Sequence, residues 1–313
     1  VGKNSGSLQN RAIGCVLTQT NEEAIWLSGQ LRQAFIPCKL VQSNDGFLVR
    51  NLLEVAVFEI FLNLQNEQNI ISQNTWDTAR TKALNHFQNS SHLPLLINLL
   101  DYFTQLYPKQ KYVSDWVAFT HESRLENFYC VDKKQVFVST IHKAKGREYD
   151  HVFVYLNAPQ IATDEEKRVL YVAFSRAKSA LTVFSNAEKL RQMCIGENVI
   201  EERYHGNPQE DNRELALYLG HKDVHLGKFQ YHQNAIDHLY SGQEIAANSL
   251  GCFTSSDGEP IVQFSKNFQD KLNDYLRKGY RVIGASVNFI VMWKNPNTGE
   301  QCRIVLPIVY LER

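Results

Sequence analysis

Two short stretches of the sequence carry residue types that could bind phosphate groups. The first is segment 140–148, which follows an apolar run of strand length and holds Gly146 among Lys143, Lys145 and Arg147. A glycine lets the backbone approach a ligand closely, and the cationic side chains can bind anions. Loops at the ends of parallel strands are the usual ligand-binding sites of α/β sheets. Spacing alone nevertheless favours a solvated turn with basic side chains, so this segment by itself assigns no function.

The second stretch is segment 163–176, whose pattern predicts an amphipathic helix with Arg176 at its end. Thr163 and Glu166 have the spacing of a capping box. The apolar stripe consists of Val169, Val172 and Ala173. Arg176 could therefore emerge at the same edge as segment 140–148. Considered alone, Arg176 is more typical of a cation that complements the negative end of a helix.

The surrounding elements predict an α/β fold. A strand-like run at 12–17 and a second at 39–41 flank a helical pattern that Asn21 would cap. Further strands follow at 136–140, 152–156 and 181–184, and a helix at 164–177 precedes the last of them. Such alternation predicts a parallel sheet covered by helices. Between these parts, residues 48–128 read as consecutive helical blocks, which predicts an all-helical insertion.

The C-terminal part predicts a small β-rich domain. The polar stretch 202–212, around Pro208, indicates a linker. A helix follows at 267–278, and the runs 281–294 and 301–311 predict a hairpin, the first with one apolar face. A strongly curved sheet or small barrel would result. Its cations could form a nucleic-acid surface, although ordinary solvated charges explain them as well: Lys222, Lys228, Lys266, Lys271, Arg277, Lys278, Arg281 and Lys294.

Composition limits the function classes. The chain of 313 residues carries 33 Lys and Arg against 33 Asp and Glu, so no overall field attracts nucleic acid or anionic membrane. Any such binding needs a local patch. The 43% hydrophobic content excludes a disordered chain. No apolar run approaches the ~18 residues that span a bilayer, and no signal peptide is visible. We expect a cytoplasmic protein without a membrane partner, and the Val at position 1 suggests a piece of a longer chain.

Neither the cysteines nor the histidines predict a metal site. The six cysteines contain no C-x-x-C pair, which argues against zinc and favours reduced thiols. Ligand-spaced partners are lacking around the C-terminal histidines His221, His225, His232 and His238. Trp76 and Trp116 lie within helical patterns and are expected in the core rather than on a DNA surface.

Taken together and in this order, STIHKAKGREYDHVFV (139–154) and EEKRVLYVAFSRAK (165–178) resemble motifs V and VI of superfamily-1 DNA helicases of the UvrD/Rep type. The opening also resembles the start of the second RecA-like domain of that family, which an inserted subdomain interrupts. This resemblance covers roughly residues 11–187. It implies a RecA-like parallel sheet in 1–200 with a helical insertion at about 48–130, followed by an accessory domain at 205–313 that has no family assignment.

The resemblance also implies roles for individual residues. Arg176 would be the arginine finger that reaches the nucleotide γ-phosphate, and Gly146 and Glu148 would face the nucleotide. Arg168 is a weaker candidate for the finger than Arg176. It could instead form an ion pair that holds this helix in place.

Three residues at the start of the loop are implied in DNA binding. Thr140 and His142 would face single-stranded DNA, and Lys143 would be a further phosphate contact.

The sequence also lacks part of an ATPase. No G-x-x-x-x-G-K-[ST] loop occurs in it, nor an Asp-Glu strand end that would hold Mg²⁺. ATP and Mg²⁺ would therefore bind only in the full-length protein, together with an upstream RecA-like domain. The resemblance implies 3′ to 5′ movement on single-stranded DNA. The alternative is a helicase-like docking module, for nucleic acid or protein, that has lost its ATP chemistry.

Overall fold

The chain divides into two compact units, and each unit is built from two separate stretches. The computed structural model describes residues 14–41, 46–64, 69–128, 135–157, 159, 161–193, 200, 213–296 and 298–313. The first unit takes Val1–Gln42 and Val131–Arg213, and the second takes Ser43–Cys130 and Glu214–Arg313. The backbone thus crosses between the units at 42/43, 130/131 and 213/214.

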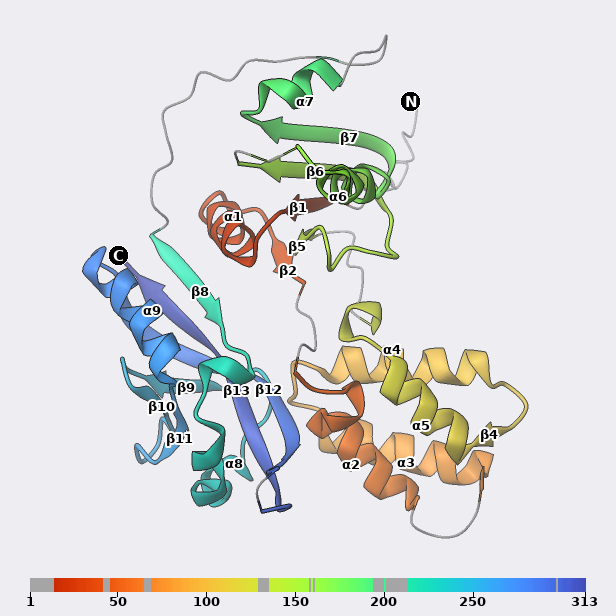
Figure 1. The fold of residues 1–313 in the computed structure, drawn as a ribbon. Helices are drawn as coiled ribbons and strands as arrows, with labels where there is room; N and C mark the ends of the chain where they lie inside the picture. The colour runs from red at the N-terminus through yellow and green to blue at the C-terminus, as the bar shows by residue number, and fades with distance from the viewer. Residues whose placement is uncertain are drawn as a thin grey trace, which may run out of the picture. The chain divides into compact units, whose positions relative to one another are not determined.

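The first unit is a parallel sheet of five strands in the order β2-β5-β1-β6-β7 (Figure 1). Its strands are β1 (Gly14–Thr18), β2 (Cys38–Leu40), β5 (Val136–Thr140), β6 (Tyr149–Leu156) and β7 (Ala177–Ser185). The central strand β1 pairs with β5 on one side and β6 on the other, so that Cys15 lies between Phe137 and Val152. This parallel sheet with helices confirms the predicted α/β, RecA-like class.

Capping boxes start both long helices of this unit. Helix α1 (Asn21–Gln33) begins after Thr20, whose side chain accepts from Glu23 N, so the predicted cap Asn21 is instead the first helical residue. Helix α6 (Asp164–Phe174) has the predicted box: Thr163 Oγ1 accepts from Glu166 N at 3.2 Å, and Glu166 Oε2 accepts from Thr163 N at 2.7 Å. A short helix, α7 (Glu188–Met193), follows β7.

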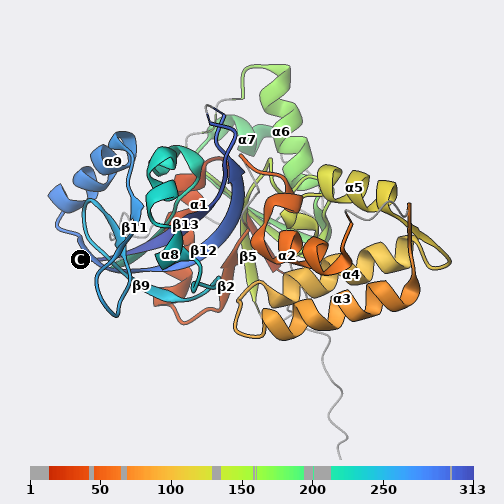
Figure 2. The ribbon, with the colours of Figure 1, turned by 90° about the horizontal axis from the view of Figure 1, so that it is seen from below.

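The second unit contains the helical block, residues 46–128 (Figures 1 and 2). Its helices are α2 (Leu53–Leu62), α3 (Gln73–His86), α4 (Leu93–Leu106) and α5 (Val113–Glu122), with a small ladder of β3 (Ile70–Ile71) and β4 (Lys111–Tyr112). Aromatic rings fill its centre. The ring centroids of Trp76 and Phe103 are 5.2 Å apart, and those of Phe103 and Trp116 are 5.0 Å apart. Trp76 and Trp116 are 1% and 0% exposed, which confirms that they belong to the core.

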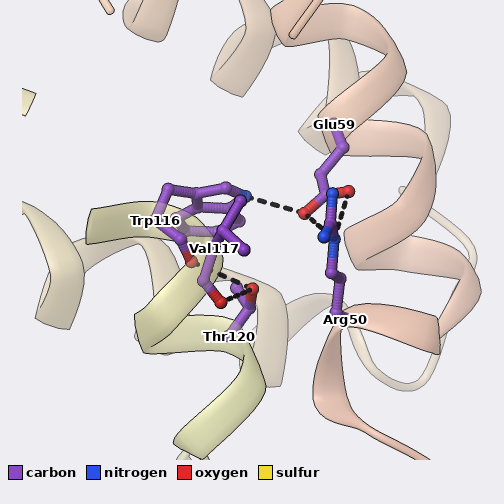
Figure 3. Close-up of polar contacts among 5 residues, drawn as sticks. All are labelled: Arg50, Glu59, Trp116, Val117 and Thr120. Atoms are coloured by element: carbon purple, nitrogen blue, oxygen red, sulfur yellow. Dashed lines mark hydrogen bonds and ion pairs between the residues drawn. The ribbon is translucent and has the colours of Figure 1, made fainter. Parts of the chain in front are cut away.

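A charged group anchors this aromatic core (Figure 3). Arg50 Nε lies 2.9 Å from both carboxylate oxygens of Glu59, and Trp116 Nε1 donates to Glu59 Oε1 at 2.9 Å. Burial raises the pKa of Glu59, while the bonds from Arg50 and Trp116 oppose that rise. Because the folded-state pKa lies above the ordinary value, the contribution of Glu59 to stability decreases as pH rises through the folded-state pKa.

We expect Glu59→Ala to lower the free energy of unfolding by about 2 kcal/mol, because it leaves the Trp116 N–H buried without an acceptor. Glu59→Gln keeps a carbonyl oxygen for that N–H and should cost less than half as much. Denaturant unfolding of both variants provides the measurement. Equal losses for Ala and Gln would show that the Trp116 bond contributes nothing.

The C-terminal sheet completes the second unit and is antiparallel, in the order β11-β10-β9-β12-β13-β8. Its strands are β8 (Glu214–Tyr218), β9 (Glu244–Ala247), β10 (Gly251–Phe253), β11 (Pro260–Gln263), β12 (Arg281–Lys294) and β13 (Gln301–Glu312). Helices α8 (Gln233–Ile236) and α9 (Lys266–Arg277) belong to the same part. A bridge joins Val224, beyond β8, to Phe264, beyond β11, so the two edges of the sheet curl toward each other. The predicted β-rich part and its long β12–β13 hairpin are thereby confirmed.

Strand β12 is buried more completely than its one predicted apolar face requires. Every residue from Ala285 to Val291 is buried, so both faces of this stretch are covered. Part of the cover comes from the helical block, because Leu52 forms a β-bridge with Val291 and His92 stacks on Phe289. Packing thus groups the helical block with the C-terminal sheet. The predicted domains, 1–200 and 205–313, divide the chain in sequence order, and that division stays a prediction.

The described thiols are not paired. Cys15, Cys38, Cys252 and Cys302 are free, and burial raises the pKa of Cys15 to about 12. The other cysteines, Cys130 and Cys194, and the predicted linker 202–212 lie outside the described residues. Within the described ranges, no helix is long and apolar enough to cross a membrane, and no group of His, Cys, Asp and Glu could hold a metal ion.

Candidate nucleotide and nucleic-acid site

Segment 141–148 connects two parallel strands that are not neighbours. It leaves the carboxyl end of β5 after Thr140 and enters the amino end of β6 at Tyr149, with β1 between the two strands. Because the strands are parallel, this segment must run from one edge of the sheet to the other. Short turns compact it: Ala144 N donates to Thr140 O at 3.2 Å, and Arg147 N donates to Ala144 O at 3.2 Å. Its first residues therefore lie toward the carboxyl edge and its last toward the amino edge.

The carboxyl edge receives the residues predicted to bind DNA. His142 is exposed, and Lys143 Nζ donates to Asn21 Oδ1 at 3.1 Å, at the start of α1. Thr140 is 7% exposed and pairs with Thr18 in the sheet. His142 and Lys143 thus offer side chains to a ligand more directly than Thr140 does.

The amino edge receives the residues predicted to bind the nucleotide. Gly146 has φ +85°, and a Cβ built there would meet no atom within 4 Å. Glycine is therefore favoured at position 146 by the left-handed backbone conformation, and not by a lack of space for a side chain. The side chain of Glu148 is exposed, and its Oε2 lies 4.0 Å from Lys178 Nζ.

Arg176 follows the end of α6 at this same edge, and its guanidinium is fixed by three hydrogen bonds. Nε donates to Val172 O at 2.9 Å, Nη1 to Arg147 O at 3.2 Å, and Nη2 to Ser175 Oγ at 2.9 Å. The Arg176 carbonyl in turn accepts from Tyr149 N at 2.8 Å. One residue thus joins the last turn of α6 to segment 141–148. The bond to Val172 O also fulfils the helix-end role expected of a lone cation. Arg168, on the same helix, is exposed.

Arg147, which the sequence suggested only as a cation of the loop, also contributes through its backbone. Its carbonyl accepts from Arg176, and its guanidinium lies close enough to Tyr149 to oppose the rise that burial causes in the pKa of that phenol. Its position between Gly146 and Glu148, two residues assigned to the nucleotide, could have drawn attention to it. The sequence could not show that its carbonyl accepts from Arg176, because a backbone contact does not depend on residue type.

The predicted basic surface of the C-terminal sheet is interrupted by acids. Arg277 pairs with Asp274 at 3.1 Å, and Arg281 pairs with Glu312 at 2.7 Å. Interleaved charges of this kind favour protein docking over binding to a uniformly anionic backbone.

A comparison with known families then decides the assignment of the middle of the chain. Residues 56–188 match the UvrD-like helicase C-terminal domain. This stretch is a UvrD-like helicase C-terminal domain. It includes most of α2, the helices α3 to α6, the whole of segment 141–148 and Arg176, so the resemblance to the C-terminal portion of a UvrD/Rep-type helicase is confirmed. The match also supports nucleotide and nucleic-acid binding for this UvrD-like domain. Curated individual proteins give no match to the chain.

We expect Gly146→Ala in this UvrD-like domain to lower the free energy of unfolding by about 1–2 kcal/mol, the cost of a left-handed backbone for an L residue. Gly14→Ala is the matched control, because Gly14 lacks a positive φ and its nearest neighbour would lie 4.0 Å from the new methyl. Urea unfolding compares the two. An unchanged Gly146→Ala would mean that the loop relaxes to another backbone conformation without cost.

Proposed function

We propose that this chain is the C-terminal motor half of an ATP-dependent DNA helicase or translocase, in which Arg176 is the arginine finger. The observation that carries the proposal is the fixed guanidinium of Arg176 where α6 meets segment 141–148. Arginine has five N–H groups, and three are used in holding the side chain. Two remain for a phosphate. A cation that is already oriented stabilises transition-state charge with little reorganisation.

The nucleotide requires a second surface. The sequence contains no G-x-x-x-x-G-K-[ST] loop, so an upstream RecA-like domain would supply the phosphate cradle and the Mg²⁺ site. Gly146 and Glu148 would face ATP from the amino edge of this sheet, beside Arg176. By itself the chain would therefore hydrolyse no ATP.

Single-stranded DNA is assigned to the opposite edge. His142 and Lys143 precede Gly146 by only a few residues, yet segment 141–148 runs between the two edges. A shift of the nucleotide-facing end would be transmitted along this short, hydrogen-bonded segment to the DNA-facing end. Such a connection offers a physical route from hydrolysis to movement along single-stranded DNA.

A docking module without ATP chemistry is the second candidate. The interleaved ion pairs around α9 and β12 favour it, as a protein-binding surface. A helix-end role accounts for the bond from Arg176 to Val172 O, but a docking role gives no reason for the bond that ties Arg176 to Arg147 O in segment 141–148. A parent coding sequence without a Walker-type loop upstream of Val1 would favour this second candidate.

We expect Arg176→Ala in the full-length protein to lower DNA-stimulated ATP hydrolysis by ~10³-fold, because the transition state loses its fixed cation. Arg176→Lys keeps the charge but not the planar fork, and should lose nearly as much. Arg168→Ala, on the exposed side of the same helix, is the matched control and should retain normal turnover. Steady-state kinetics, with circular dichroism to verify folding, test this. Normal turnover by Arg176→Ala would exclude the finger role.

We expect His142→Ala in the full-length protein to weaken single-stranded DNA binding by about tenfold, because stacking or hydrogen bonding to one base is lost. Nucleotide affinity should change less than twofold, since His142 lies toward the other edge. Fluorescence anisotropy with labelled DNA and with a labelled nucleotide separates the two effects. A larger loss of nucleotide affinity than of DNA affinity would contradict the assignment of the edges.

A further inference from the structure

The helical block and the C-terminal sheet meet at a buried carboxylate. Glu54, in α2, is 1% exposed, and its Oε1 accepts from Ser90 Oγ at 2.7 Å and from Ser241 Oγ at 2.9 Å. Ser90 lies between α3 and α4, whereas Ser241 lies between α8 and β9. His92 Nδ1 is 3.9 Å from the same oxygen. A single oxygen atom thus joins side chains from both parts of the second unit.

Hydrogen bonds to backbone carbonyl groups cross the same boundary. Ser91 N donates to Ser241 O at 2.8 Å, and Asn51 Nδ2 donates to Met292 O at 2.9 Å. Leu52 adds its β-bridge to Val291. Bonds between main chains fix the register of the two parts, which loosely docked side chains would not do.

Ring and glycine contacts leave little space at this boundary. The rings of His92 and Phe289 stack at 4.8 Å, and Phe47 packs against Phe289 at 5.6 Å. A Cβ on Gly242 would lie 2.8 Å from Ser91 Cβ, and one on Gly46 would lie 2.9 Å from His221 Nδ1. Packing this close is typical of a protein interior.

The buried carboxylate of Glu54 also makes the helical block and the C-terminal sheet depend on each other. Removing a carboxylate from water costs several kcal/mol unless hydrogen bonds compensate. Both donors go to Oε1 and come one from each part, while Oε2 has no hydrogen-bond partner among the described residues, so loss of either part would leave the carboxylate with a single donor. The apolar contacts of Leu52 and Phe289 then supply the driving force, while Glu54 accepts one hydrogen bond from each part.

We propose that the helical block and the C-terminal sheet form one cooperative folding unit, joined at Glu54, rather than an insertion and a separate domain on a linker. The helical block, which interrupts the motor sheet in sequence, is then completed by residues more than a hundred positions later. Any partner that stabilises the C-terminal sheet also stabilises the helical block. This inference requires no ATPase activity and holds or fails independently of the proposed function.

Hydrogen exchange of the whole chain, followed by mass spectrometry, tests the proposal. We expect amides at 95–103 in α4 and at 285–291 in β12 to exchange through a common opening. Ser241→Ala changes only the C-terminal sheet, and it should speed exchange at both sites by about tenfold, because Glu54 loses one buried hydrogen bond. Amides of β1 and β6, in the first unit, should keep their rates. Faster exchange in β12 with unchanged α4 would overturn the proposal.

Three further variants and one control test whether the effect of Ser241→Ala is merely local. Glu54→Gln keeps one carbonyl acceptor and should accelerate both sites less than Glu54→Ala does. Glu59→Ala alters a carboxylate whose bonds stay inside the helical block, yet it should also speed exchange in β12. Lys82→Ala, at an exposed position of α3, is the neutral control. If Glu54→Ala does not fold, Ser241→Ala and Glu59→Ala still decide, and an effect of Glu59→Ala confined to α4 would contradict the proposal.

Discussion

The arrangement of the candidate site depends on one topological constraint: β5 and β6 are parallel and lie on opposite sides of β1. The chain must therefore return from the end of β5 to the start of β6 across the full length of the sheet. Eight residues, 141–148, make this return, and their turns shorten them further. Arg176 holds the far end by its bond to Arg147 O. Ligand-facing groups at two edges of one sheet are thus properties of a single short connection.

Much of the fold follows from local sequence chemistry. The capping box at Thr163 and Glu166, the stop at Gly279 and the long hairpin strands could all be predicted, because each depends on neighbours in sequence. The parallel sheet followed from the alternation of strands and helices. The candidate site was predicted from two motifs that occur in a fixed order, and not from spacing alone. Considered separately, the basic loop could be a solvated turn and Arg176 an ordinary cation at a helix end.

What could not be predicted depends on distant packing. The alternation in β12 predicts one apolar face, but its other face is also buried, in part because the helical block, far earlier in the chain, covers it. Phe35 is a second case. Its φ of +56°, just after α1, is the left-handed conformation that glycine usually adopts at a helix end. Phe35 N donates to Arg32 O, and Ile36 N donates to Leu31 O. An exposed phenylalanine in that conformation carries a backbone cost of about 1–2 kcal/mol that no propensity pattern indicates.

The position of the insertion connects these observations to the proposed motor. The chain leaves the first unit after β2 and returns to it just before β5, and these strands are neighbours in the sheet. One of the three crossings between the units therefore lies just before β5. That strand is five residues long and is hydrogen-bonded on both sides, to β1 and to β2. Segment 141–148 begins directly after its last residue, Thr140. Under the proposed function, single-stranded DNA and the nucleotide would act on opposite ends of this connection, and the bonds of Arg176 hold the nucleotide-facing end in place.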